Sequence, residues 1–152
     1  MSGDQLETLA KKLKGKTSKS LNSTVIEVEP AGVLDACLVV ASLPGFYHLT
    51  TITAVDIWED IELTYHFWRD RSFVSVRTKV SKGHPEIQSI SGSLPSAVLY
   101  EAEIRDLFGV TFVGNPYTGK RLLLPDDYPE DLPPPLRAEA DPETIRKRMR
   151  LE

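Results

Sequence analysis

The clearest hydrophobic pattern in the chain lies between residues 94 and 125. Apolar residues recur there at steps of three and four, which predicts one buried stripe along an α-helix. The stripe consists of Ala97, Tyr100, Ile104, Leu107 and Phe108. Ser96 precedes it as a candidate N-cap, and Gly109 follows it as a residue that can take the left-handed conformation closing a helix. A β-branched run then predicts a short strand over residues 110–113.

The polar side of this helix carries four charged residues, namely Glu101, Glu103, Arg105 and Asp106. Glu101 and Arg105 are four positions apart with the acid first. This order predicts a surface ion pair worth roughly 0.3 kcal/mol. A solvated helix face is the simplest interpretation of the four charges.

Two hydrophobic periods organise the residues before this helix. A helical period predicts an amphipathic helix over residues 6–13, ended by Gly15, and a second helix over 33–43 between Pro30 and Pro44. A strand is predicted over 22–29. A period of two then predicts three strands over 46–58, 61–68 and 73–80, with tight turns at 59–60 and 69–71. We therefore expect an α+β fold in which helices pack on one face of a mainly antiparallel sheet.

Trp68 falls on the polar side of its predicted strand. Alternation gives the side of the sheet but not what lies against it. Two interpretations remain open: an exposed side chain available to a partner, or one covered by a helix or by packing at the sheet edge.

Proline is frequent after residue 115, at positions 116, 125, 129, 133, 134, 135 and 142. Each proline removes a backbone donor and biases its predecessor toward extended geometry. We therefore predict a globular core over 1–115 and an extended C-terminal tail over 116–152. Asp141 and Pro142 predict a short closing helix to residue 150. The large apolar residues of the tail favour docking along a protein surface over a free linker.

Composition and charge exclude several classes of function. The net charge of −4 argues against general affinity for nucleic-acid phosphates. No apolar run reaches the roughly 18 residues that span a bilayer, and the absence of an apolar leader predicts a cytoplasmic location. The single Cys37 lies in an apolar helical pattern that favours a buried thiol. One cysteine cannot hold an iron–sulfur cluster, which generally takes about four.

Motifs of a stand-alone enzyme are missing. The three histidines have no metal-pair spacing, and the chain has no glycine-rich phosphate loop, GxSxG elbow or CxxC. One candidate acid–base or cation site remains, a carboxylate cluster of Glu101, Glu103, Asp106, Asp126 and Asp127. The pair Asp126–Asp127 more readily suggests ion pairs between subunits, together with Arg121 and Arg137.

The pattern in this region as a whole exceeds what amphipathicity requires. It comprises EAEIRDLFGVTFVGNP at residues 101–116, KRLLLPDDYP at 120–129 and PLR at 135–137. It resembles the small hydrophilic C subunit of proton-pumping NADH:quinone oxidoreductase (respiratory complex I), and the related subunit of membrane-bound, energy-converting hydrogenases. The resemblance is strongest over residues 85–137. Ala102 stands where the respiratory form usually has arginine, and Asn115 where it commonly has histidine, which favours the hydrogenase branch.

The resemblance implies a non-catalytic structural subunit in the hydrophilic arm of a membrane-bound hydrogenase, a complex that couples proton reduction to ion translocation. The core would pack on the large catalytic subunit, and the tail would wrap it, on the cytoplasmic side of the membrane. Iron–sulfur clusters and a nickel–iron centre are expected in partner subunits and no cofactor in this chain. Interface roles are assigned to nine residues: Glu101, Glu103, Asp106, Arg121, Asp126, Asp127, Tyr128, Leu136 and Arg137.

Three alternatives stand beside this interpretation. The first is the equivalent subunit of a complex I-like quinone oxidoreductase, and the second is the equivalent subunit of a related sulfur-reducing membrane complex. The third belongs to another class, a small metal-dependent enzyme that uses the carboxylate cluster.

Overall fold

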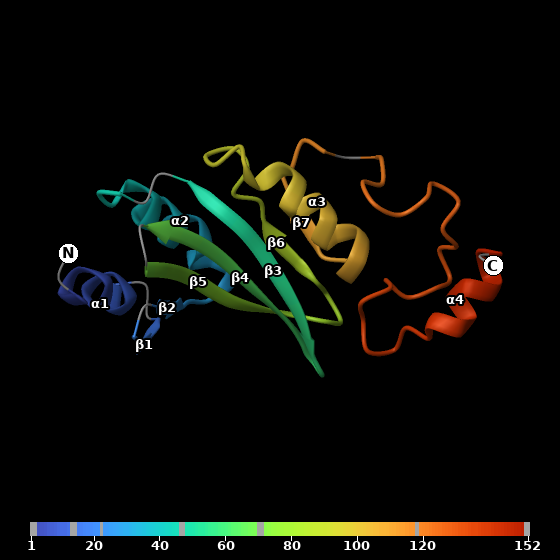
Figure 1. Ribbon diagram of the computed structural model, residues 1–152, viewed down its shortest axis with the longest axis horizontal. Helices are drawn as coiled ribbons and strands as arrows, with labels where there is room; N and C mark the ends of the chain where they lie inside the picture. Colours follow the sequence, from blue (N-terminus) through green and yellow to red (C-terminus); the bar gives the residue numbers. More distant parts are fainter. Residues whose placement is uncertain are drawn as a thin grey trace.

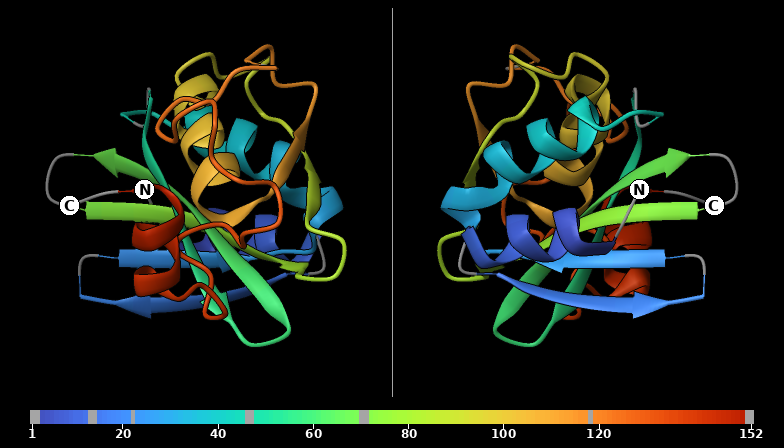
Figure 2. Two further views of the ribbon diagram at one scale, coloured as in Figure 1. Left: turned by 90° about the vertical axis from the view of Figure 1, so that its right-hand side faces the viewer. Right: turned by 90° about the vertical axis from the view of Figure 1, so that its left-hand side faces the viewer.

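The computed structural model of the chain describes residues 3–12, 15–21, 23–45, 48–69, 72–117 and 119–150. Within these residues a five-stranded sheet forms one layer, and helices α2 (Val33–Ser42) and α3 (Ala97–Phe108) cover one of its faces (Figures 1 and 2). The predicted α+β fold with a mainly antiparallel sheet is confirmed. Six residues of the predicted helices, strands and turns before the tail lie outside the described residues: Leu13, Asn22, Phe46, Tyr47, Asp70 and Arg71.

The sheet has the strand order β1-β2-β5-β4-β3. Its strands are β1 (Lys16–Ser20), β2 (Ser23–Glu27), β3 (Leu49–Ile57), β4 (Asp60–Arg69) and β5 (Ser72–Ser81). The last three form the predicted antiparallel meander, while β2 lies parallel to β5. The sequence pattern does not predict β1, because KTSKS has no alternating apolar residues. Its order comes from antiparallel pairing with β2.

Alternation along the strands builds the core. In β4 the side chains of Ile61, Leu63, Tyr65 and Phe67 all point to the helix-covered face and are fully buried. The helix α2 adds Cys37, whose thiol is buried as predicted. Burial raises the pKa of this thiol well above its usual range, because a thiolate would lose its hydration there.

Trp68 lies on the opposite face of the sheet, as its position in the alternation predicts. Its side chain remains 45% exposed beside its cross-strand neighbour Phe73, which is 43% exposed. Of the two interpretations, the structure supports the exposed one.

The predicted central helix is α3, and Gly109 closes it in the left-handed conformation with φ +70°. Ser96 occupies the N-cap position, but its side chain makes no capping hydrogen bond, so that part of the expectation is wrong. Tyr100 and Leu107 are only partly buried, at the margin of the core.

A short parallel pair flanks α3. The strand β6 (Glu86–Gln88) precedes the helix and β7 (Thr111–Val113) follows it, so β6, α3 and β7 form a crossover unit. The remaining elements before the tail are α1 (Gly3–Lys12), which contacts β1 and β2, and the 3₁₀ turn η1 (Pro30–Gly32).

The described residues of the tail form no helix or strand until α4 (Pro142–Arg148). The Asp141 carboxylate accepts hydrogen bonds from the amides of Glu143 and Thr144, which confirms the predicted cap. The helix ends two residues earlier than predicted. Figure 1 shows the tail, in orange and red, leaving β7 near α3 and running past the end of this helix to α4.

Candidate functional site

The carboxylate of Asp106 joins α3 to the tail. One oxygen, Oδ2, accepts hydrogen bonds from the amides of Leu122, Leu123 and Leu124 at 2.6, 2.9 and 3.4 Å. The other, Oδ1, lies 3.1 Å from the guanidinium of Arg105. Asp106 is only 7% exposed, so its charge depends on these donors for stabilisation. One buried side chain therefore fixes the start of the tail against the helix.

The pKa of Asp106 reflects the same contacts. Burial raises the pKa, but the hydrogen bonds from the Leu123 amide, from Arg105 and from the two neighbouring amides outweigh it. The net pKa is below the usual value for aspartate, so the carboxylate is charged near neutral pH.

Arg105 reaches the same segment of chain from the helix. Its guanidinium donates to the carbonyl of Tyr117 at 2.5 Å and to the carbonyl of Lys120. It also lies 5.8 Å from the centre of the Tyr117 ring, within the range of a cation–π contact. Arg105 thus binds the tail of its own chain. The predicted surface ion pair between Arg105 and Glu101 is wrong, because Glu101 is buried and binds other donors.

Glu101 lies inside the chain with no exposed surface. Oε1 accepts from the Ile90 amide at 2.9 Å, and Oε2 accepts from the Ser89 hydroxyl at 2.5 Å and the Asn115 amide group at 2.7 Å. Ser89 follows β6 and Asn115 lies two residues beyond β7. The parallel strand pair therefore brings both next to the crossover helix. Burial raises the pKa of Glu101, although the three hydrogen bonds oppose the rise.

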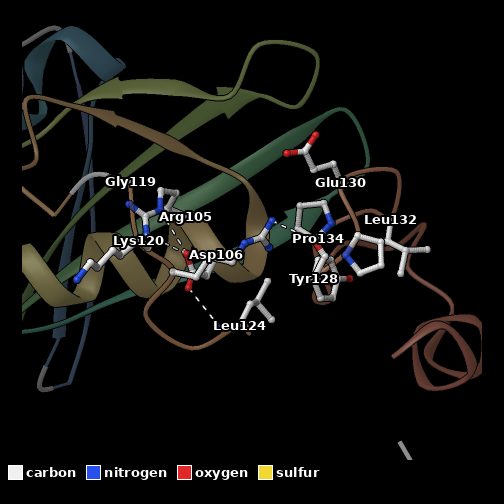
Figure 3. A pocket seen from close by; sticks show the side chains of 11 residues that line it. Arg105, Asp106, Gly119, Lys120, Leu124, Tyr128, Glu130, Leu132 and Pro134 are labelled. Carbon is white, nitrogen blue, oxygen red and sulfur yellow. Dashed lines mark hydrogen bonds and ion pairs between the residues drawn. The ribbon is translucent and has the colours of Figure 1, made fainter. Parts of the chain in front are cut away.

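A cavity of about 460 Å³ lies between α3 and the tail. Figure 3 shows Arg105 and Asp106 on the helix side, and Tyr128, Leu132 and Pro134 on the tail side. The side chain of Arg121, which also lines the cavity, lies 5.3 Å over the Tyr128 ring and donates to the Tyr128 carbonyl at 3.3 Å. The Tyr128 hydroxyl donates to the Pro133 carbonyl at 2.8 Å, which holds the far wall together.

A second attachment lies at the end of α3. Arg137 donates to the Phe108 carbonyl at 2.7 Å, and the Leu136 amide donates to the Leu107 carbonyl at 3.0 Å. A Cβ atom on Gly109 would lie 2.8 Å from Pro134. The glycine therefore closes the helix and also leaves room for the tail.

A third attachment fixes the tail to the sheet. Asp56 Oδ2 accepts from the Ala138 amide at 2.8 Å and from the Lys82 ammonium at 2.7 Å, and Lys82 also pairs with Glu139 at 2.7 Å. The Asp56 side chain is 6% exposed. These partners are far apart in sequence, so no local pattern could have indicated them.

The structure sorts the nine predicted interface residues into two groups. Glu101, Asp106 and Tyr128 are buried against their own chain, and Arg121 and Arg137 are half-buried with bonds to their own backbone. These five therefore bond within their own chain, and their role in an interface stays a prediction. The exposed members are Glu103, Asp126, Asp127 and Leu136, and their interface role stays a prediction.

The five carboxylates of the alternative enzyme site are not brought together. Glu101 and Asp106 bind separate sets of donors, and Asp126 and Asp127 lie exposed on the tail. Across the described ranges, no three side chains of His, Cys, Asp or Glu are grouped to hold a metal ion. No helix in the same ranges is both long and apolar enough to cross a membrane.

The fold and the attachments define the chain as a small α+β protein whose extended C-terminal segment is bonded to the last turn of its own crossover helix and to the sheet. Its sequence matches the family described as the respiratory-chain NADH dehydrogenase 30 Kd subunit over residues 26–145, most of the core and nearly all of the tail. The chain belongs to this family. The motif at residues 101–137 is the part of the sequence that showed the resemblance.

Two relatives show how much of a longer protein the chain matches. The chain is 42% identical to the C subunit of the NADH-quinone oxidoreductase of Moorella thermoacetica over 88 residues, which cover 55% of this chain and 59% of that protein. It is 41% identical to formate hydrogenlyase subunit 5 of Escherichia coli over 64 residues, which cover 42% of this chain and 11% of that protein. The matched part is thus little more than half of the first relative and about a tenth of the second.

A solved structure shares the fold over nearly the whole chain. A chain in the structure of the membrane-bound sulfane sulfur reductase, an archaeal respiratory membrane complex, superposes with a TM-score of 0.75. The superposition covers 97% of this chain and 91% of that one at 21% identity. The match extends over the tail as well as the core.

Proposed function

We propose that the chain is a non-catalytic structural subunit of a membrane-bound oxidoreductase complex of the hydrogenase type. In this proposal it packs on the large catalytic subunit, in the hydrophilic arm on the cytoplasmic side of the membrane. The observation that carries the proposal is the family match over residues 26–145, which spans the core and the attached tail. The redox centres, iron–sulfur clusters and a nickel–iron centre, belong to partner subunits.

The arrangement of the tail supports a docking role. Asp106, Arg105 and Arg137 fix the tail at residues 117–124 and again at residue 137, so the course of this part is set before any partner binds. Such pre-organisation lowers the entropy cost of association. Leu123 and Leu136 remain 53% exposed, and Asp126 and Asp127, which lie between them in the sequence, are also exposed. These groups are available to another subunit.

The hydrogenase branch is the first candidate because of Ala102 and Asn115, which depart from the respiratory form, and because of the likeness to formate hydrogenlyase subunit 5. The equivalent subunit of a quinone-reducing complex is the second candidate, since the identity to the Moorella NADH-quinone oxidoreductase chain is equally high. The equivalent subunit of a sulfur-reducing complex is the third candidate, because a chain of the membrane-bound sulfane sulfur reductase shares the fold.

The experiment is affinity purification of the tagged chain from gently solubilised native membranes, with identification of co-purifying subunits and metal analysis. Stoichiometric recovery with a large subunit, iron and nickel is the expected result. Iron without nickel would replace the hydrogenase assignment by the quinone- or sulfur-reducing one. Recovery of the chain alone would overturn the structural-subunit proposal.

A further inference from the structure

Trp58 has an unusual backbone conformation and an unusually exposed side chain. It lies in the turn between β3 and β4, with φ +69°, and its side chain is 91% exposed. Figures 1 and 2 show that this turn projects beyond the rest of the sheet. Trp58 is thus a prominent aromatic group at the tip of a long hairpin.

The turn itself gives no reason for a tryptophan. Ile57 pairs with Asp60, so Trp58 and Glu59 form a two-residue connection. At positive φ such connections favour glycine or asparagine, and a bulky residue there is strained. Strained residues of this kind concentrate at binding and functional sites. Because so little of the Trp58 side chain is covered by its own chain, internal contacts of the indole do little to offset the strain.

The base of the hairpin is held firmly. Asp56, two residues before Trp58, binds Lys82 and the Ala138 amide of the tail. The Glu59 carbonyl accepts from the Lys82 amide at 2.9 Å. The indole is therefore presented on a rigid support, and little conformational entropy would be lost when it binds.

The surroundings of the indole are acidic. Glu59 and Asp60 follow it directly, and the nearby Lys82 is already paired with Asp56 and Glu139. An acidic tip is repelled by anionic phospholipid surfaces and is complementary to basic groups on a protein. A protein pocket therefore fits this tip better than a membrane surface does.

We propose that Trp58 is an anchor residue that enters an apolar pocket with a basic rim on a neighbouring protein subunit. The inference rests on the proposed function, because it requires that the chain be part of a complex. Trp58 lies on the β3–β4 hairpin and is separate from the exposed tail residues already assigned to the interface. Aromatic side chains that fill a partner's pocket commonly dominate the binding energy of an interface.

Hydroxyl-radical footprinting with peptide mass spectrometry tests the burial of Trp58. The oxidation rate of Trp58 is compared between the isolated full-length chain and the intact complex purified through a tag on this chain. Oxidation about fivefold slower in the complex is expected, because anchor residues become fully desolvated. Unchanged oxidation of Trp58 in an intact complex would overturn the anchor and leave the proposed function standing. Recovery of the chain without any partner would overturn both.

The variant Trp58→Gly separates binding from folding. Glycine accepts the positive φ, so the melting temperature of the isolated variant should equal or exceed that of the unsubstituted chain. Retention in the complex during a salt wash should fall about tenfold or more, as for a hot-spot residue. Leu21→Gly is the matched control, because Leu21 is a fully exposed apolar residue in the β1–β2 turn. Equal retention of both variants would contradict the proposal.

Vesicles of phosphatidylcholine and phosphatidylglycerol test the other environment that suits an exposed indole. The isolated chain should not sediment with them, and its tryptophan fluorescence should not shift to the blue. Sedimentation that the Trp58→Gly substitution abolishes would replace the protein pocket with a lipid surface and overturn the proposal.

Discussion

Glu101 illustrates how one residue decides the local structure around it. Its two oxygens accept three hydrogen bonds in a site closed to solvent. In Glu101→Gln the amide group replaces one acceptor with a donor, so one buried donor loses its partner. We expect a loss of about 1–3 kcal/mol in the free energy of unfolding, measured by urea denaturation.

Glu103→Gln is the matched control for this change. It lies two residues away on the same helix, but its side chain is exposed. Its effect should stay within about 0.5 kcal/mol. Equal effects of the two substitutions would show that the buried hydrogen bonds of Glu101 contribute nothing to stability.

Asp106 should control the acid stability of the chain. Its folded-state pKa is lowered, so the unfolded chain takes up the proton first, and the stabilisation it gives is lost as pH falls through the folded pKa. The loss should begin near the unfolded pKa of about 4 and continue below it. Asp106→Asn should flatten this acid limb and cost about 1–3 kcal/mol at neutral pH, whereas the exposed Asp127→Asn should do neither. Thermal unfolding between about pH 2.5 and 7, a range that includes the unfolded pKa, measures both effects.

Glu101 should affect the pH dependence of stability in the opposite direction to Asp106. Its pKa is raised in the folded chain, so the folded state retains the proton longer and stability falls as pH rises from about 4 through the folded pKa. The two carboxylates therefore act on different parts of the pH curve. A stability profile in Glu101→Gln that keeps the slope above about pH 4 would assign that slope to another group.

The sequence could not distinguish these two carboxylates from solvated ones. Both lie on the polar side of the helical pattern, next to Glu103, which is in fact exposed. Apart from Arg105, which adjoins Asp106, their partners are 11 to 18 residues away and become neighbours only when the chain folds. Periodicity reports hydrophobic faces and carries no information about buried hydrogen-bond networks.

At the scale of elements, the junction of α3 and the tail depends on Gly109. Its φ of +70° disfavours any side chain, and an added Cβ would approach Pro134 to 2.8 Å. Gly109→Ala should therefore lower the free energy of unfolding by about 1–3 kcal/mol. It should also speed amide exchange at Leu136, whose hydrogen bond to Leu107 closes this junction.

Gly92→Ala controls for the loss of a glycine as such. Its φ is not in the left-handed region, and an added Cβ would meet nothing within 4 Å. Denaturation of the two variants side by side should show a change within about 0.5 kcal/mol for Gly92→Ala. If Gly109→Ala changes the free energy of unfolding as little as Gly92→Ala does, neither the left-handed backbone nor the close approach of Pro134 makes a side chain at residue 109 costly.

Elements with strong periodicity were predictable, and those ordered by their neighbours were not. The apolar alternation in residues 61–80 indicates β4 and β5, and the stripe from Ala97 to Phe108 indicates α3. The β-branched run at residues 110–113 likewise indicates β7. The polar strand β1 and the three-residue strand β6 carry no such pattern. They are ordered by backbone pairing, β1 with β2 and β6 with β7.

For the whole molecule, hydrophobic patterning predicts the architecture but not the course of the tail. The prolines of the tail predict extended chain, and the family match includes the tail up to residue 145. The anchors Asp106, Arg137 and Asp56 hold it on its own core through bonds to backbone amides and carbonyls, which no side-chain pattern encodes.

This course determines how the docking role of the tail is best tested. Removing the tail before Pro116 would also remove the amides that satisfy Asp106, so a truncated chain could fail through misfolding. Substituting Asp126 and Asp127 by lysine changes only exposed groups. The isolated double variant should unfold within about 1 kcal/mol of the unsubstituted chain, since each surface change costs little.

In the complex the same double charge reversal should act strongly, because like charges brought together at a docked site can cost several kcal/mol. Co-purification of the large subunit with the tagged Asp126→Lys/Asp127→Lys chain should therefore drop about tenfold or more at low salt. The reversal Glu29→Lys/Asp35→Lys, at exposed positions of the core outside the assigned interface, should leave co-purification unchanged. If the tail variant co-purifies as well as this control, the tail does not dock through its acidic pair. The assignment of Asp126 and Asp127 to the interface would then be wrong.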